Sequence, residues 1–148
     1  MMPYMFGRLA AVTASALAVS LAACSSSSTA ASTAVDLTGT YSLTSFIFNG
    51  TSEPIDQSDG ATLTCTKKTY AVVGTGNYAQ LLSDSGTYTA TDTATSNGAI
   101  SGKFTQESVE GHGGSTGSFR LSANKDTLSE NVNSQGGPVQ SVLVRVGG

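Results

Sequence analysis

The sequence predicts an all-β domain over residues 36–148, folded as a small antiparallel up-and-down barrel of about eight strands. Short segments rich in β-branched residues alternate between two faces with a period of two. Gly, Asn, Asp and Ser separate these segments at short intervals, and no stretch after residue 36 has a helical period. Closure into a barrel removes exposed sheet edges, and the meander-like spacing favours this architecture over the alternative, a β-sandwich.

Residues 1–23 are predicted to be a signal peptide. Arg8 precedes an uncharged apolar run, Leu9–Leu21, which is shorter than the ~20 residues that a membrane-spanning helix needs. The motif that ends it, Leu21-Ala22-Ala23-Cys24, resembles the lipobox of bacterial lipoproteins. The resemblance implies cleavage between Ala23 and Cys24, with a diacylglyceryl group on the Cys24 sulfur and an acyl chain on its amine. The alternative is an ordinary cleaved signal, or a membrane helix, with a chance cysteine.

Residues 24–35 are predicted to be the lipidated cysteine and a disordered tether. The segment consists almost entirely of Ser, Thr and Ala, and it has too little apolar surface to offset the entropy lost on ordering. Two or more acyl chains anchor a protein stably, so the partner implied at Cys24 is a membrane of the cell envelope. Ser25 at the second mature position resembles the outer-membrane pattern, which would apply in a Gram-negative host.

The first half of the domain yields four expected strands. In the first, Tyr41 and Leu43 alternate with Ser and Thr; in the second, Leu63 and Cys65 alternate with threonines. Asn49-Gly50 favours the positive φ angles of a tight hairpin turn. The expected strands are Gly39–Phe48, Ala61–Thr66, Thr69–Val73 and Tyr78–Leu82.

The second half yields five more strands. The threonines of Thr87–Thr95 lie on one face, opposite Tyr88 and Ala90, which is the strictest alternation in the chain. Asn97-Gly98 and Asn124-Lys125-Asp126 supply hairpin turns. The expected strands are Gly86–Thr95, Ala99–Val109, Ser118–Ala123, Thr127–Asn133 and Val139–Val146.

The inward positions of these strands define an expected core. Cys65 is predicted to be a buried thiol in phase with Leu63, and no second cysteine of the domain can pair with it. The remaining expected core residues are Tyr41, Leu43, Phe46, Phe48, Tyr70, Val72, Tyr88, Ile100, Phe104, Phe119, Leu121, Leu128, Val142 and Val144.

The two ends of the domain carry a second resemblance. Gly39-Thr40-Tyr41 is similar to the Gly-X-aromatic motif that opens strand one of lipocalin-like domains, with Tyr41 in place of the usual Trp. In that family a basic residue of the last strand packs over the aromatic ring. The resemblance therefore implies a lipocalin-like barrel closed by Arg145 over Tyr41.

Composition and motifs exclude several function classes. Ten acidic against seven scattered basic residues argue against a nucleic-acid partner. One histidine without a nucleophile and an orienting acid predicts no enzyme and no catalytic residue, and the His and Cys positions predict no metal site and no cofactor. The Gly-rich segment around that histidine is instead a candidate binding loop, formed by Gly111, His112, Gly113 and Gly114.

These inferences lead to an expected function that is not enzymatic. The chain is predicted to be a lipid-anchored envelope binding module for a small apolar ligand or an envelope protein. An inhibitor of a periplasmic hydrolase and a purely structural envelope lipoprotein are the alternatives. A barrel with few large core residues could be either hollow or filled, so the sequence leaves open whether a cavity exists.

Overall fold

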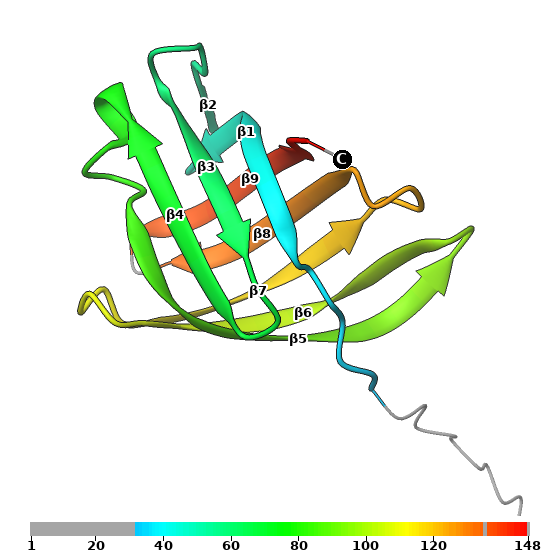
Figure 1. The fold of residues 1–148 in the computed structure, drawn as a ribbon. Coiled ribbons are helices and arrows are strands. Elements are labelled where there is room, and N and C mark those ends of the chain that lie inside the picture. Colours follow the sequence, from blue (N-terminus) through cyan, green and yellow to red (C-terminus); the bar gives the residue numbers. More distant parts are fainter. Residues whose placement is uncertain (1–31, 135, 148) are drawn as a thin grey trace, which may run out of the picture. The chain divides into compact units, whose positions relative to one another are not determined.

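The domain is all-β, as predicted. The computed structural model describes residues 32–134 and 136–147; the expected signal peptide, Cys24 and the first part of the tether lie outside them. Figure 1 shows β1, β3 and β4 crossing in front of the strands that complete the barrel. The strands are β1 (Gly39–Phe48), β2 (Thr51–Glu53), β3 (Gly60–Cys65), β4 (Thr69–Thr75), β5 (Asp84–Ser96), β6 (Ala99–Ser108), β7 (Gly114–Leu121), β8 (Thr127–Ser134) and β9 (Gly137–Arg145).

The strands form a closed antiparallel barrel. Each strand from β3 to β8 pairs with the next along the chain, and β1 pairs with both β3 and β9. Eight strands thus make the up-and-down barrel that the spacing predicts. The ninth, β2, folds back on the end of β1 through the Asn49-Gly50 turn, whose φ angles of 51° and 80° only Asn and Gly adopt easily.

A β-bulge in β1 lets residues of different parity face the core. The register against β9 shifts between Leu43 and Ser45, so Thr44 is the extra residue. Tyr41 and Leu43 point inward before the bulge, and Phe46 points inward after it. This explains how one strand supplies both odd-numbered and even-numbered core residues.

Inward glycines give the sheet room to curl, and aromatic rings cover them. A Cβ at Gly102 would lie 2.1 Å from the Thr91 carbonyl oxygen and 2.6 Å from the Phe119 ring. Phe119 is the cross-strand partner of Gly102, and Phe104 is the partner of Gly117 in the same way. A side chain at either glycine would collide with backbone as well as ring, so close packing here requires glycine.

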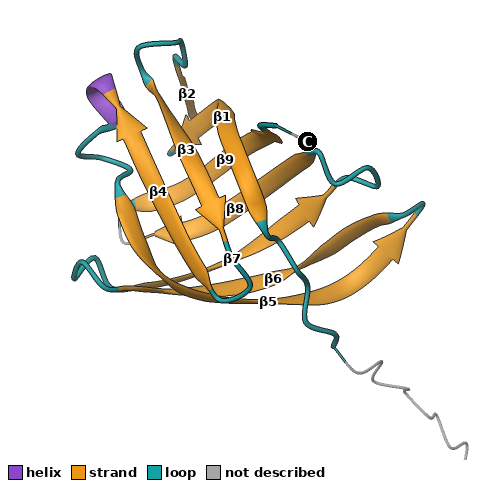
Figure 2. Ribbon diagram, viewed as in Figure 1, coloured by secondary structure: helices purple, strands orange, loops and turns teal. Residues whose placement is uncertain are grey.

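Three sequence predictions about the elements were wrong. Tyr78–Leu82 is not a strand: a 3-10 turn, η1 (Gly76–Tyr78), follows β4, and the chain then turns toward β5 (Figure 2). The last residues of the segment assigned to the tether are ordered, because Thr33 accepts a hydrogen bond from the Asp92 amide and Val35 donates one to Ala90. Backbone pairing with β5 therefore extends the domain to residues 33–35. No described residue belongs to a helix that could cross a membrane.

The third error concerns the face of the last strand. Val142 is only half-buried and Val144 is 38% exposed, while Ser141 and Leu143 point inward. The high hydropathy of the two valines suggested that the even-numbered residues of this strand point inward, whereas the odd-numbered residues do. The packing of Arg145 at the closed end requires the odd positions to face inward, and the register of β9 against β1 satisfies that requirement.

The domain has a complete core of its own. The other expected core residues are buried or packed against the buried cluster, and Cys65 is a free thiol at 6% exposure, as predicted. Burial raises the pKa of that thiol to about 12. Because residues 31–148 form one compact unit whose strand pairs and core are all internal, the domain meets the physical requirement for folding alone.

Candidate functional site

One end of the barrel is sealed by tightly packed side chains. Tyr41 and Leu128 have no exposed surface, and Leu121 is 1% exposed. Leu37, ahead of β1, covers the same end and accepts a hydrogen bond of 3.1 Å from the Tyr41 hydroxyl. This closed end leaves no room for a ligand.

Arg145 completes the closed end at the position predicted for it. Its Cζ lies 5.1 Å from the centroid of the Tyr41 ring, and its Nη2 donates hydrogen bonds to the Tyr41 hydroxyl and the Thr38 carbonyl. Gly39 makes this possible: a Cβ there would lie 2.9 Å from the guanidinium carbon. The Gly-X-aromatic pattern thus has a physical reason, since the glycine leaves space for the cation that covers the aromatic ring two residues later.

The other end of the barrel, the open end, contains a cavity of about 430 Å³. That size lies in the usual range of small-molecule sites. Its apolar wall comes from β1, β3, β4, β8 and β9 and from the segment after η1. The apolar residues of the wall are Leu43, Phe46, Ala61, Leu63, Val72, Leu81, Leu82, Val132, Val139 and Leu143.

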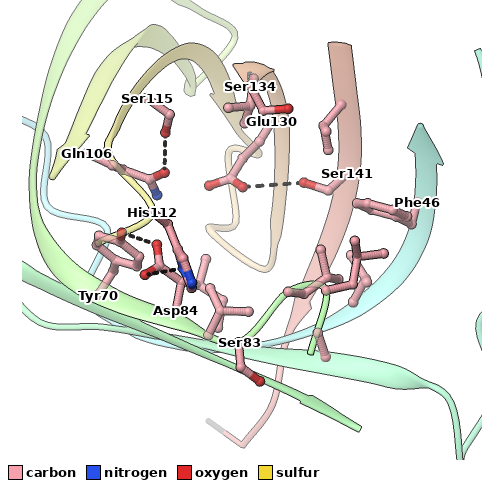
Figure 3. Close-up of a pocket in the computed structure, with 18 of the residues that line it drawn as sticks. Phe46, Tyr70, Ser83, Asp84, Gln106, His112, Ser115, Glu130, Ser134 and Ser141 are labelled. Carbon is pink, nitrogen blue, oxygen red and sulfur yellow. Dashed lines mark hydrogen bonds and ion pairs between the residues drawn. The ribbon is translucent and has the colours of Figure 1, made fainter. Parts of the chain in front are cut away.

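Polar groups gather on the remaining lining of the cavity. Figure 3 shows Glu130 projecting from β8, with Ser141 on one side and the hydrogen-bonded Gln106 and Ser115 on the other. Asp84 and His112 lie farther along the same lining. The described residues that line the cavity include no Lys and no Arg.

Asp84 has its hydrogen-bonding capacity largely satisfied. Its Oδ2 accepts a 2.6 Å hydrogen bond from the Tyr70 hydroxyl, and its Oδ1 accepts one of 2.5 Å from the Ser108 hydroxyl. His112 Nδ1 lies 3.3 Å from Oδ1. Burial by itself raises the pKa of Asp84, but the hydrogen bonds from Ser108 and Tyr70 outweigh it and hold the pKa below the usual value. Asp84 is therefore an ionised anchor that joins β4, β5, β6 and the following loop.

Glu130 is far less well satisfied. Its Oε2 accepts a single long hydrogen bond, 3.3 Å, from the Ser141 hydroxyl, and no described residue donates to its Oε1. Glu130 is partly buried, and its carboxyl points into the cavity (Figure 3). Burial raises the pKa of Glu130 to about 7, with the Ser141 hydrogen bond opposing the shift. Glu130 is thus a proton-exchanging group inside the cavity.

The predicted binding loop lies at the rim of this cavity. His112 and Gly113 line it, whereas Gly111 lies outside the lining and Gly114 is the first residue of β7. The loop is held at its base, because the Val109 amide donates to the Ser85 carbonyl and the Glu110 carboxylate accepts from the Ser85 hydroxyl. His112 itself is 56% exposed. The Cys24 and Ala23 positions lie outside the described residues.

Sequence reasoning missed Glu130, the most unusual group of the cavity. A signal was present: Glu130 alternates in phase with Leu128 and Val132, so a carboxyl occupies an inward position of an otherwise apolar face. Ser141 lies in phase with Leu143 in the same way. Polar residues at core positions of a strand are candidates for a site, because burying them costs free energy unless something uses them.

The fold and the site define a small antiparallel β-barrel of eight strands with one additional strand, closed at one end and hollow at the other. No protein-family model matches this chain, and no curated protein matches it in sequence. Among the described residues, no three His, Cys, Asp or Glu side chains are grouped closely enough to hold a metal ion.

Proposed function

We propose that this chain is a lipid-anchored binding module of the cell envelope that holds a small, largely apolar ligand in its barrel. The observation that carries the proposal is the cavity of about 430 Å³, open at one end and walled mainly by aliphatic and aromatic side chains. Small barrels with filled interiors are structural, while those with a hollow mouth hold one small ligand. A binding site that is concave, mostly apolar and provided with a few polar groups is the usual form of a ligand pocket.

The anchoring part of the proposal rests on Leu21-Ala22-Ala23-Cys24. In this proposal a diacylglyceryl group is attached to Cys24, the chain is cut after Ala23, and the barrel is held at the membrane surface by residues 25–32. In a Gram-negative host the membrane would be the outer membrane, and the barrel would face the periplasm.

Intact-mass spectrometry of the membrane-extracted protein tests the anchor. The expected mass is that of residues 24–148 plus two or three acyl chains, and a Cys24→Ala variant should lack the acyl mass. An unlipidated wild-type chain would contradict the anchor and leave the cavity proposal to be tested separately.

Fluorescence of N-phenyl-1-naphthylamine, an uncharged apolar probe, tests the cavity in residues 24–148 carrying Cys24→Ser. We expect saturable enhancement with a stoichiometry of one, and abolition by Ala61→Trp, which places an indole in the cavity wall. Ala71→Trp, on the outward face of the neighbouring strand β4, is the matched control and should bind like the parent. Absence of binding to a folded parent would favour the inhibitor or structural alternatives.

A further inference from the structure

The ionisable groups of the cavity favour one sign of ligand charge. Among the described residues that line the cavity, the Asp, Glu and His side chains are Asp84, Glu130 and His112. The same lining contains no Lys and no Arg. A cavity with carboxylates and low-dielectric walls attracts cations and repels anions more strongly than an exposed surface would. A fatty acid or other ionised acid is therefore the wrong kind of amphiphile for this site.

The two carboxyl groups differ in their availability to a ligand. Asp84 already accepts hydrogen bonds from Tyr70 and Ser108 and contacts His112. Glu130 has only the long bond from Ser141, and its Oε1 faces the cavity with no donor from the described residues. A buried carboxylate with so few donors destabilises the fold unless a partner arrives, so Glu130 is the group that a ligand would complete.

We propose that the cavity selects a small amphipathic amine, whose ammonium group binds the Glu130 carboxylate while its hydrocarbon part lies against the apolar wall of Leu43, Leu63 and Leu143. The inference rests on the proposed function, because it requires that the cavity hold a small ligand. It adds the chemical class of that ligand.

The surroundings of Glu130 suit an ammonium group. An ammonium has three N–H donors and no acceptor, and the lining that Glu130 shares offers oxygen acceptors in the hydroxyls of Ser141 and Ser134 and in the side-chain carbonyl of Gln106, which also accepts a hydrogen bond from Ser115 (Figure 3). Charge-assisted hydrogen bonds of this kind are roughly twice as strong as neutral ones. The leucines stand on β1, β3 and β9 and line the same cavity, so one molecule can contact both parts.

The proposal predicts a direction of pH dependence. The pKa of Glu130 is raised to about 7, so the carboxylate that binds the amine is mostly ionised at pH 8 and mostly protonated at pH 6. Amine affinity should therefore fall about tenfold from pH 8 to pH 6. The other ionisable groups that face the interior are Cys65 (β3), Tyr70 (β4), Asp84 (β5) and His112 (the β6–β7 loop), with Tyr41, Tyr88 and Arg145 at the closed end. The Glu130→Gln variant described below assigns the pH dependence to one of these groups.

Isothermal titration with three eight-carbon ligands tests the inference on residues 24–148 carrying Cys24→Ser. The ligands are octylamine, octan-1-ol and octanoate, which share a chain and differ in charge. At pH 8 we expect octylamine to bind at least tenfold more tightly than octanol, and octanoate to bind most weakly. The octanol affinity should not change between pH 8 and pH 6.

Two variants assign the preference to one carboxyl. Glu130→Gln should reduce octylamine affinity at least tenfold, leave octanol affinity unchanged and remove most of the pH dependence. Glu107→Gln changes an exposed glutamate on β6 and should alter none of these values.

The outcomes separate the inference from the function on which it rests. Equal binding of the three ligands, or an amine preference that survives Glu130→Gln, overturns the inference and leaves the binding function standing. Failure of all three ligands to bind the folded protein overturns both.

Discussion

The two ends of the barrel are built from the same strands but on opposite principles. At the closed end, Tyr41 and Leu128 are fully buried, and Arg145 fills the last gap with donors aimed at carbonyl and hydroxyl oxygens. At the open end, the same strands carry Ser141 and Glu130 at inward positions, around about 430 Å³ of space. The contrast indicates that the closed end contributes most to the stability of the fold. The open end contributes less, because its polar inward residues and its cavity replace close apolar packing.

The largest effect should come from comparing one substitution at the two ends. Leu128→Ala removes a fully buried side chain in the closed end and should lower the free energy of unfolding by about 3–5 kcal/mol. Leu82→Ala, at a half-buried position that lines the cavity, should cost only about 1 kcal/mol, since that side chain loses less contact with protein. Urea unfolding followed by circular dichroism measures both; equal losses would refute the contrast.

Glu130→Gln should stabilise the protein, and only at neutral to alkaline pH. The folded-state pKa of Glu130 is raised from 4.5 to about 7, so the folded protein binds this proton more tightly than the unfolded chain does. Stability from this group is therefore greatest below pH 4.5 and is lost as the pH rises through 7. Replacing it should add up to about 3 kcal/mol at pH 8, reduced by any water in the cavity, and almost nothing at pH 4. A variant less stable than the parent at pH 8 would mean that the carboxylate has partners of its own.

Arg145→Met should lower stability by about 2 kcal/mol with no effect on ligand binding. It removes the cation over the Tyr41 ring and the hydrogen bonds to the Thr38 and Lys125 carbonyls, but keeps an apolar stem of similar length. Tyr41→Phe keeps the ring under the guanidinium and should cost about 1 kcal/mol. The relevant comparison is thermal unfolding together with probe affinity, and altered affinity in either variant would show that the two ends are coupled.

Asp84→Asn should have the smallest effect and the opposite pH dependence to Glu130→Gln. The hydrogen bonds from Ser108 and Tyr70 keep the folded-state pKa of Asp84 low, so its contribution is present above the unfolded-state pKa of about 3.9 and is lost as the pH falls through the lower folded-state value. The variant should lose about 1 kcal/mol at pH 7 and nothing at strongly acidic pH. If the change in unfolding free energy varied with pH in the same way for Asp84→Asn and Glu130→Gln, the different environments assigned to the two carboxyl groups would be contradicted.

Much of the closed end could be predicted from sequence because its signals are local. The period of two and the Asn-Gly turns each lie within a few residues, and they predicted the barrel. The placement of Arg145 over Tyr41 was implied by the resemblance of the Gly-X-aromatic motif to lipocalin-like domains. The prediction of which face of β9 points inward was wrong because it also relied on a local signal, the hydropathy of single residues. Local hydropathy favoured Val142 and Val144 as inward residues. Because side chains alternate along a strand, an inward Arg145 requires the odd-numbered residues of β9 to point inward, so the predicted core residues and the predicted position of Arg145 were incompatible.

The open end could not be predicted because its features depend on contacts distant in sequence. Whether the barrel is hollow depends on how side chains from β1, β4, β8 and β9 fill a shared volume, which no single strand reveals. The hydrogen bonds that Asp84 accepts from Tyr70 and Ser108 join positions 14 and 24 residues apart in the sequence. Glu130 and Ser141 each had a signal in the sequence, because each is a polar residue at an inward position of its strand, and the glycine-rich loop supplied His112 and Gly113 of the lining.

The most direct test of the central claim is an amide chemical-shift titration of the ¹⁵N-labelled domain with N-phenyl-1-naphthylamine. We expect saturable shifts at the open end, around Val132, Ser141 and Phe46, while the amide signals of Leu121, Leu128 and Tyr41 at the closed end do not move. Shifts confined to the outer face of the barrel or to the closed end, or no shifts at saturating probe, would contradict the assignment of the open end as the binding site.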